Sequence, residues 1–387
     1  MGTLVGALGH QHRALVDERG GVAPTDAGWE LRWWIGADDR WRVPAREASV
    51  RQTLIEAAPV VQTAMRVPSG DAVHRVYGVA GEGDPIIIEV QNASPAPFVV
   101  AFVASGASSA GLDGSTVILD GARALVSARA PSRWSCAVGS TEVEVLSGAA
   151  RSGPFRAVRD RGGRLEVALL FPVPHRATVR VALPRRRAAP VGDLTAIPDA
   201  DAVARGWRAQ VERCMTIELP DEQLLGAVRA ALADVLLVTT GGRPDTAALA
   251  ALEDWGFDDE VATAWPRLSW RQRRAASRRS DVPAAWSDVA SASAEGGAAL
   301  LLGVRSLLAH DSGDVITILA DLPVEWRGAS LDVRGAPTRH GPLSFSVRWH
   351  GERAALLWES PGGSTLCAPS LDPTWSTTEP TGEALLG

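Results

Sequence analysis

The chain alternates between two kinds of hydrophobic pattern. Before Pro184 and after Asp314, short apolar segments with a period of two residues are separated by turn residues, which is typical of β-strands. Between them, from Leu219 to Trp265, apolar residues recur at spacings of three and four, which predicts amphipathic helices. The pattern therefore predicts an α+β protein that is mostly β, with its helices in the middle of the chain.

The first β-patterned region is expected to fold as a large antiparallel sandwich, because many short strands are separated by turns such as SGD, GEGD and DGAR. In its last strand, Val179 and Val181 are predicted to face the core while Thr178 faces water. Residues 86–88 are three successive isoleucines, so their strand is expected to be buried on both faces. The predicted strands are 29–35, 50–56, 60–67, 72–79, 85–91, 98–104, 116–119, 124–128, 142–146, 164–171 and 177–183.

Local signals mark the ends of the helices. A first helix follows Pro220, with carboxylates in its first turn, and stops at Gly241. A second is expected to begin at Asp245 as N-cap and to end at Gly256, which can take the left-handed C′ conformation. A third starts immediately at 258, and another is expected over 294–310. Together these predict a helical hairpin followed by one further helix.

Composition narrows the class of protein. With 387 residues, 46% of them hydrophobic, the chain is long enough for two or three domains. All 39 basic residues are arginine, which excludes lysine-dependent chemistry such as Schiff bases, and the net charge of -6 argues against nucleic acid. The N-terminus lacks a cationic start, and no apolar run approaches the roughly 18 residues of a membrane span. A cytoplasmic protein without a membrane partner is therefore expected.

The cysteines argue against bound metal or disulfides. Cys136, Cys214 and Cys367 are far apart and odd in number, so they are expected to be free thiols. His340 and His350 lie near a predicted hairpin turn and are not expected to bind metal. The sequence predicts no cofactor and no metal site.

The order of elements resembles that of the six-hairpin glycosidases. A predicted helix with Trp207, a short extended piece and the Leu-Pro-Asp motif at 219–221 resemble the junction between their N-terminal β-supersandwich and their (α/α)6 barrel. Residues 249–265 resemble one helical hairpin of such a barrel, and 314–359 resemble the β domain that follows it. The resemblance implies a sandwich at 1–190, a linker at 191–219, a helical domain at 220–310 and a β domain at 311–387.

A complete barrel does not fit in this chain. From Pro220 to His310 there are 91 residues, counting both ends. Twelve helices of about 11 or 12 residues with loops of about 4 to 6 residues need roughly 200. The family carries its catalytic acid and base in barrel loops, so the resemblance implies a truncated relative that lacks most positions for them.

Two sets of residues are candidates for a site. Glycoside hydrolysis needs two carboxylates roughly 5 to 10 Å apart, and the densest acidic cluster supplies Asp254, Asp258 and Glu260 as candidate catalytic residues. The alternative is that these acids stabilise the start of a helix. The chain has 14 Trp against one Tyr and six Phe. Its candidate sugar-stacking residues are Trp255, Trp265 and Trp270, although tryptophans near helix ends also pack domain interfaces.

Other polar groups favour structural roles. The arginine-rich run at 271–279 is either a patch for an anion or acidic partner or, as we favour, a solvated helix face. In the segment 66–77, Arg75 and Tyr77 share one strand face and His74 lies on the other, which favours structural pairing over a site.

Three functions remain open. The favoured one is a non-catalytic, glycosidase-like protein that acts as a carbohydrate-binding or interaction module in carbohydrate metabolism. The first alternative is an active glycoside hydrolase that uses a carboxylate pair near the helical region. The second is a structural scaffold for a protein partner. The expected partners are an oligosaccharide, or a protein or second copy covering the face left by the missing helices.

Overall fold

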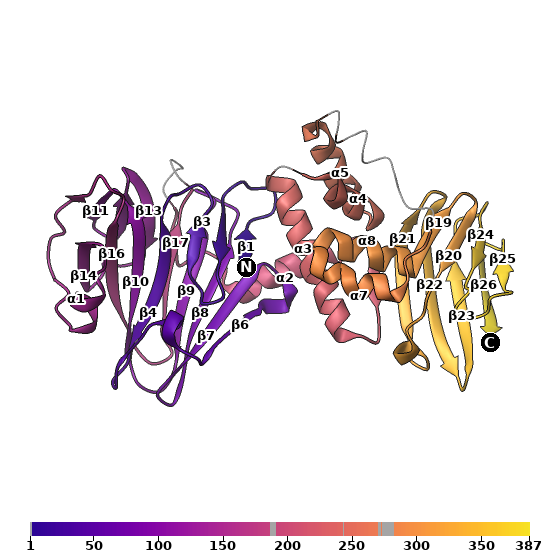
Figure 1. The fold of residues 1–387 in the computed structure, drawn as a ribbon, viewed down its shortest axis with the longest axis horizontal. Helices are drawn as coiled ribbons and strands as arrows, with labels where there is room; N and C mark the ends of the chain where they lie inside the picture. The colour runs from indigo at the N-terminus through magenta and orange to yellow at the C-terminus, as the bar shows by residue number, and fades with distance from the viewer. Residues whose placement is uncertain (1, 186–190, 243, 270–271, 273–281) are drawn as a thin grey trace. The chain divides into compact units, whose positions relative to one another are not determined.

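The computed structural model describes residues 2–185, 191–242, 244–269, 272 and 282–387 (Figure 1). Within this part of the chain, 40% of residues are in strands and 23% in helices, which confirms the α+β, mostly β class. The chain divides into two compact units, Met1–Arg205 and Gly206–Gly387. The finer division into four segments stays a prediction. Trp270 and the arginines of the run at 271–279 lie outside the described residues.

The first unit contains two antiparallel sheets. One sheet has the order β1 (Thr3–Gly6), β2 (Arg13–Val16), β3 (Val22–Pro24), β4 (Glu30–Gly36), β10 (Phe98–Ala107), β16 (Leu165–Val173), β14 (Arg133–Val138), with β5 (Trp41–Arg42) paired to β4. The other has the order β15 (Val158–Arg159), β11 (Ser109–Asp113), β12 (Thr116–Leu119), β13 (Ala122–Ser127), β17 (Thr178–Leu183), β9 (Ile86–Ala93), β8 (Gly70–Gly78), β7 (Val60–Val67), β6 (Val50–Leu54).

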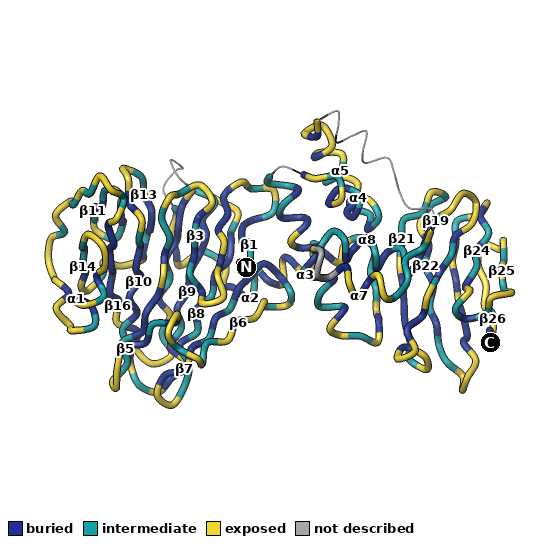
Figure 2. The backbone as a smooth tube through the Cα atoms, in the orientation of Figure 1, coloured by how far each residue is buried: buried dark blue, intermediate teal, exposed yellow. Residues whose placement is uncertain are grey.

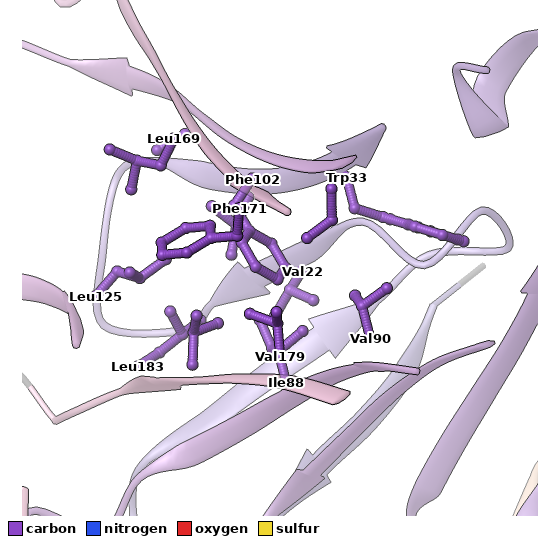
Figure 3. Packing of buried hydrophobic residues seen from close by; sticks show 14 of the residues in the cluster. Val22, Trp33, Ile88, Val90, Phe102, Leu125, Leu169, Phe171, Val179 and Leu183 are labelled. Atoms are coloured by element: carbon purple, nitrogen blue, oxygen red, sulfur yellow. The ribbon is translucent and has the colours of Figure 1, made fainter. Parts of the chain in front are cut away.

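The two sheets face each other across one hydrophobic core (Figure 3). Phe102 and Phe171 stand on one sheet, with their rings 5.9 Å apart, and Ile88 and Val179 reach toward them from the other. All three isoleucines of 86–88 are fully buried, as their apolar run predicts. Burial of both inner faces produces the sandwich-like packing that the alternating pattern predicts.

Consecutive tryptophans on β4 pack on opposite faces of their sheet, because side chains alternate along a strand. Trp33 belongs to the core between the sheets and stacks on His74 of the facing sheet, with ring centroids 4.8 Å apart. Trp34 belongs to a second apolar cluster, which includes Val145. That cluster gives β4 and its neighbours a covered outer face.

The prediction of a strand at 142–146 is wrong, because this segment forms helix α1 (Glu142–Leu146). The alternation of Glu and Val suggested two equivalent inward valines, but Val143 is 80% exposed and only Val145 is buried. The carboxylate of Glu166 on β16 accepts hydrogen bonds from the backbone N–H and the hydroxyl of Thr141, at 2.6 and 2.8 Å. This anchor at the helix start and the packing of one valine override the β-propensity of the segment.

The second unit begins within α2 (Ala200–Val211) and holds most of the helices. The others are α3 (Glu222–Gly241), α4 (Thr246–Asp254), α5 (Asp258–Ala264), α7 (Trp286–Glu295) and α8 (Gly297–Leu308), with a 3-10 turn η3 (Trp265–Arg267). Helix α8 contacts α3, α4 and α7. Helix α3 is long and apolar enough to cross a membrane, but 44% of that stretch is buried within the protein, as in a core helix.

The helix ends follow the local signals. Asp221 and Asp245 are the N-caps of α3 and α4, and their carboxylates accept from backbone N–H groups at 2.8 and 2.7 Å. Gly256, with φ 86°, takes the left-handed conformation just after α4, the first helix of the hairpin. The Phe257 N–H donates to the Leu252 carbonyl at 2.9 Å. These caps confirm the predicted hairpin. The helix predicted over 294–310 instead ends at Leu308, where a strand begins.

Two further sheets complete the second unit. A five-stranded antiparallel sheet has the order β18 (Thr216–Glu218), β21 (Leu331–Thr338), β22 (Gly341–His350), β23 (Arg353–Glu359), β26 (Thr381–Leu386). A four-stranded sheet has the order β19 (Ala309–Ser312), β20 (Val315–Ile318), β24 (Thr365–Cys367), β25 (Ser376–Thr377), with β20 and β24 parallel. In both units, buried positions follow the strands and exposed positions gather at the turns (Figure 2).

Candidate functional site

A cavity of about 370 Å³ lies within the second unit, where α2, β18 and α3 meet. This volume is within the range of small-molecule sites. The apolar side chains that line it are Val211, Met215, Ile217, Leu225, Val228 and Leu232, with Trp255 beside them, and the polar ones are Arg208, Glu212, Thr216, Glu218 and Arg229. A second cavity, in the first unit, holds about 30 Å³, which suits ordered water rather than a ligand.

The chain folds back twice to form this cavity. After α2 ends, β18 joins the five-stranded sheet as an edge strand, with Ile217 opposite Val333 of β21. Pro220 and the N-cap Asp221 then start α3 in a new direction. The backbone N–H of Met215 donates to the carbonyl of Trp255 at 3.2 Å, which holds the connection against the end of α4. Residues of α2, β18 and α3 therefore converge on one space.

Three charged side chains from two helices form a cluster at the cavity. Glu212 Oε1 accepts a hydrogen bond from Arg208 Nε at 3.0 Å, one helical turn away on α2. The same oxygen lies 3.5 Å from Arg229 Nη2 of α3. The side chains of Arg208, Glu212 and Arg229 are 51%, 38% and 39% exposed. Ion pairs this open to solvent contribute little stability, so the cluster does little to hold the fold.

The candidate catalytic carboxylates occupy helix ends outside this cavity lining. Asp254 is the last residue of α4, and Asp258 and Glu260 lie in the first turn of α5. The Glu260 carboxylate, on a side chain only 13% exposed, forms an ion pair with Arg213, whose guanidinium lies 5.2 Å from the Phe257 ring centroid. Acids in a first turn are stabilised by the helix dipole. The structure therefore places Asp258 and Glu260 where the alternative interpretation expects them, whereas Asp254 lies at the C-terminal end of α4, where the dipole does not favour a carboxylate.

Two of these acids, Asp258 and Glu260, also act on the charge environment of Cys214. Burial raises the pKa of the Cys214 thiol; Arg213 opposes this shift, and the charges of Glu260 and Asp258 add to it. A raised pKa disfavours the reactive thiolate. This environment suits an inert free thiol, and all three cysteines are free.

The two candidate tryptophans that the structure describes, Trp255 and Trp265, do not form a common sugar-stacking surface. Trp255 is 1% exposed and its indole N–H donates to the Leu301 carbonyl at 3.1 Å, so it serves as part of the cavity wall and offers no open ring face. Trp265 is 39% exposed in η3 and is not among the residues lining the cavity. Trp270 lies outside the described residues.

The polar residues of 66–77 make structural contacts. Tyr77 donates to Glu89 at 2.8 Å, and Arg180 donates to the same carboxylate. Arg75 donates to the side chain of Gln62 at 2.8 Å. Among the described residues, no group of three or more His, Cys, Asp or Glu side chains could hold a metal ion.

Sequence reasoning did not identify the polar lining of the cavity. Arg208 and Glu212 are separated by four positions on a helix, which signals an ion pair but not a cavity. Thr216, Glu218 and Arg229 join them only through the reversal of the chain after α2. Compared with protein-family models and with curated proteins, the chain matches none.

Proposed function

We propose that the protein is a non-catalytic saccharide-binding protein that holds a sugar in the cavity between α2, β18 and α3. The observation that carries this proposal is the composition of the cavity lining: apolar side chains from two helices and a strand stand beside two arginines, two glutamates and a threonine. A sugar ring has apolar C–H faces and a rim of hydroxyl groups. Such a ligand packs against the apolar part of the lining while its hydroxyls bond to the charged part.

The proposal that the protein does not catalyse hydrolysis rests on the candidate carboxylates. Asp254, Asp258 and Glu260 are absent from the cavity lining, and Glu260 is engaged by a guanidinium. The described helices between Glu222 and Leu308 are also too few for a complete six-hairpin barrel. A truncated relative of the six-hairpin glycosidases, with its N-terminal sandwich taken as a supersandwich, is the ancestry we propose.

A glycoside hydrolase is the second candidate, because Glu212 and Glu218 both line the cavity. Hydrolysis requires two carboxylates that flank the scissile bond. Glu212 is held between two arginines, which is why we favour binding. Turnover that is lost in Glu218→Gln would support the hydrolase.

The first test is a glycan-array screen of the full chain, followed by calorimetry and a hydrolysis assay on each glycan that binds. Leu225→Trp enlarges a half-buried side chain of the lining and is expected to abolish binding by filling the cavity. Trp265→Ala removes an exposed indole outside the lining and is the matched control, expected to bind normally. Binding that is lost in Trp265→Ala and kept in Leu225→Trp would contradict the cavity proposal. No binding to any glycan would leave the scaffold function.

A further inference from the structure

The charges in the cavity are arranged unevenly. Arg208 and Arg229 approach one oxygen of Glu212 from two different helices, so this corner holds two guanidiniums and one carboxylate. The Arg229 contact, at 3.5 Å, is longer than an N–H···O hydrogen bond. Because a guanidinium carries five N–H donors, this loose pair does not saturate Arg229. Arg229 therefore keeps N–H donors that are available to a ligand.

The lining as a whole has a different balance. Glu218 of β18 also lines the cavity, so its two arginines and two glutamates sum to no net charge. A ligand with several negative charges would meet Glu218 as well as the arginines. A ligand with a single carboxylate at one end and hydroxyl donors at the other complements both the arginine corner and the Glu218 carboxylate.

From this arrangement we infer that the ligand is an acidic saccharide containing a uronic acid residue. Its carboxylate pairs with Arg229, its hydroxyls donate to Glu218, and its ring packs on the apolar lining. A planar carboxylate matches the forked donors of a guanidinium, and such charge-assisted hydrogen bonds are stronger than those to a neutral hydroxyl. The inference rests on the proposed function and names the class of saccharide for the same cavity.

The experiment compares a glucuronate-containing disaccharide with the disaccharide that has glucose in its place. The two differ only in a carboxylate and a hydroxymethyl group. Calorimetry on the full chain is expected to show roughly tenfold tighter binding of the acidic disaccharide, as charge-assisted bonds predict. In Arg229→Gln this preference is expected to disappear, so that the acidic and the neutral disaccharide bind with similar affinity.

Two further variants test whether the preference comes from the charges in the cavity. Arg353→Gln changes an exposed arginine of β23 outside the cavity and is expected to keep the full preference. Glu212→Gln removes the resident carboxylate while keeping its shape, and is expected to bind the acidic disaccharide more tightly than the wild type. Each variant is first checked by circular dichroism and by its thermal midpoint. Both are expected to match the wild type, because the altered side chains are partly or fully exposed.

The outcomes separate this inference from the proposed function. Equal binding of both disaccharides, with binding lost in Leu225→Trp, would overturn the acidic class and leave a neutral-sugar cavity. A preference that survives Arg229→Gln would overturn the role of the arginine corner. If the glycan array and both disaccharides show no binding, the proposed function fails and this inference fails with it.

Discussion

His74 should make the first unit lose stability in acid. Its imidazole is completely buried between the two sheets and stacks on Trp33 at an interplanar angle of 11°. Its Nδ1 atom has no hydrogen-bond partner. Burial lowers the pKa of His74 from 6.5 to about 3, because a charged ring loses its hydration without gaining a counter-ion.

The direction of the effect follows from proton binding. Between pH 6.5 and about 3, the unfolded chain carries a proton on His74 and the folded protein does not. The free energy of unfolding is therefore fully maintained above pH 6.5 and falls as the pH drops through this window. One pH unit corresponds to about 1.4 kcal/mol. At pH 4.5 His74 alone should lower the free energy of unfolding by about 3 kcal/mol relative to neutral pH.

The measurement compares the wild type with His74→Phe, which keeps an aromatic ring but cannot titrate. Urea unfolding at pH 7 and pH 4.5 is followed by hydrogen exchange of peptides covering β4 and β8, because a chain of two units need not unfold in one transition. The wild type is expected to lose about 2 to 3 kcal/mol more than the variant between the two pH values. Acid effects of other groups cancel in this difference.

His74→Gln is the matched control, because it is polar and also cannot titrate. It should follow the shallow pH dependence of His74→Phe even if its stability at pH 7 is lower. Parallel pH curves for the wild type and both variants would refute the reasoning. That result would mean that His74 gains a proton and a partner in the folded protein.

Two further predictions concern stability. Asp221→Ala and Asp245→Ala should each lower the free energy of unfolding of the second unit by about 1 kcal/mol in urea titrations, because each removes an N-cap acceptor. The corresponding Asn variants should keep most of the free energy of unfolding, because Asn also accepts at an N-cap. An equal loss in the Ala and Asn variants would contradict the capping role. Glu89→Ala should lower the free energy of unfolding of the first unit by roughly 3 to 5 kcal/mol in urea titrations, since it leaves the buried Tyr77 phenol and the partly buried Arg180 guanidinium without their shared carboxylate. Tyr77→Phe should cost only about 1 kcal/mol, and similar losses in both variants would argue against a buried charge at the centre of this network.

Local chemistry explains which parts of the fold were predictable. Capping depends on residues three or four positions apart, so Asp245 and Gly256 mark the ends of α4 in the sequence as they do in the structure. Strands with a strong apolar face, such as Val60–Val67 and Thr116–Leu119, have the bounds that their pattern predicts. For these elements, the residues of the element itself are enough to predict where it begins and ends.

Elements that depend on distant partners were missed or wrong. Strands β1 to β3 lie before Trp29, where the apolar runs are short and glycine-rich, and they are stabilised by pairing along one edge of a sheet. The segment 142–146 satisfies β-propensity, but the carboxylate of Glu166, far along the chain, anchors it as a helix. A periodic pattern reports which face is apolar and does not report which surface covers it.

The candidate site depends even more on residues that are distant in the sequence. The density of acids points to Asp254, Asp258 and Glu260, yet Asp258 and Glu260 lie in the first turn of α5, where carboxylates are favoured without any substrate. The charges at the cavity are sparse in the sequence, and Arg229 meets Glu212 only because the chain reverses twice between them. A binding site requires unlike groups to converge on one space, and convergence is a property of the fold. The junction at 207–221 therefore matters more to the cavity than the acidic cluster does, because the end of α2 and the edge strand β18 build its walls together with the following helix α3.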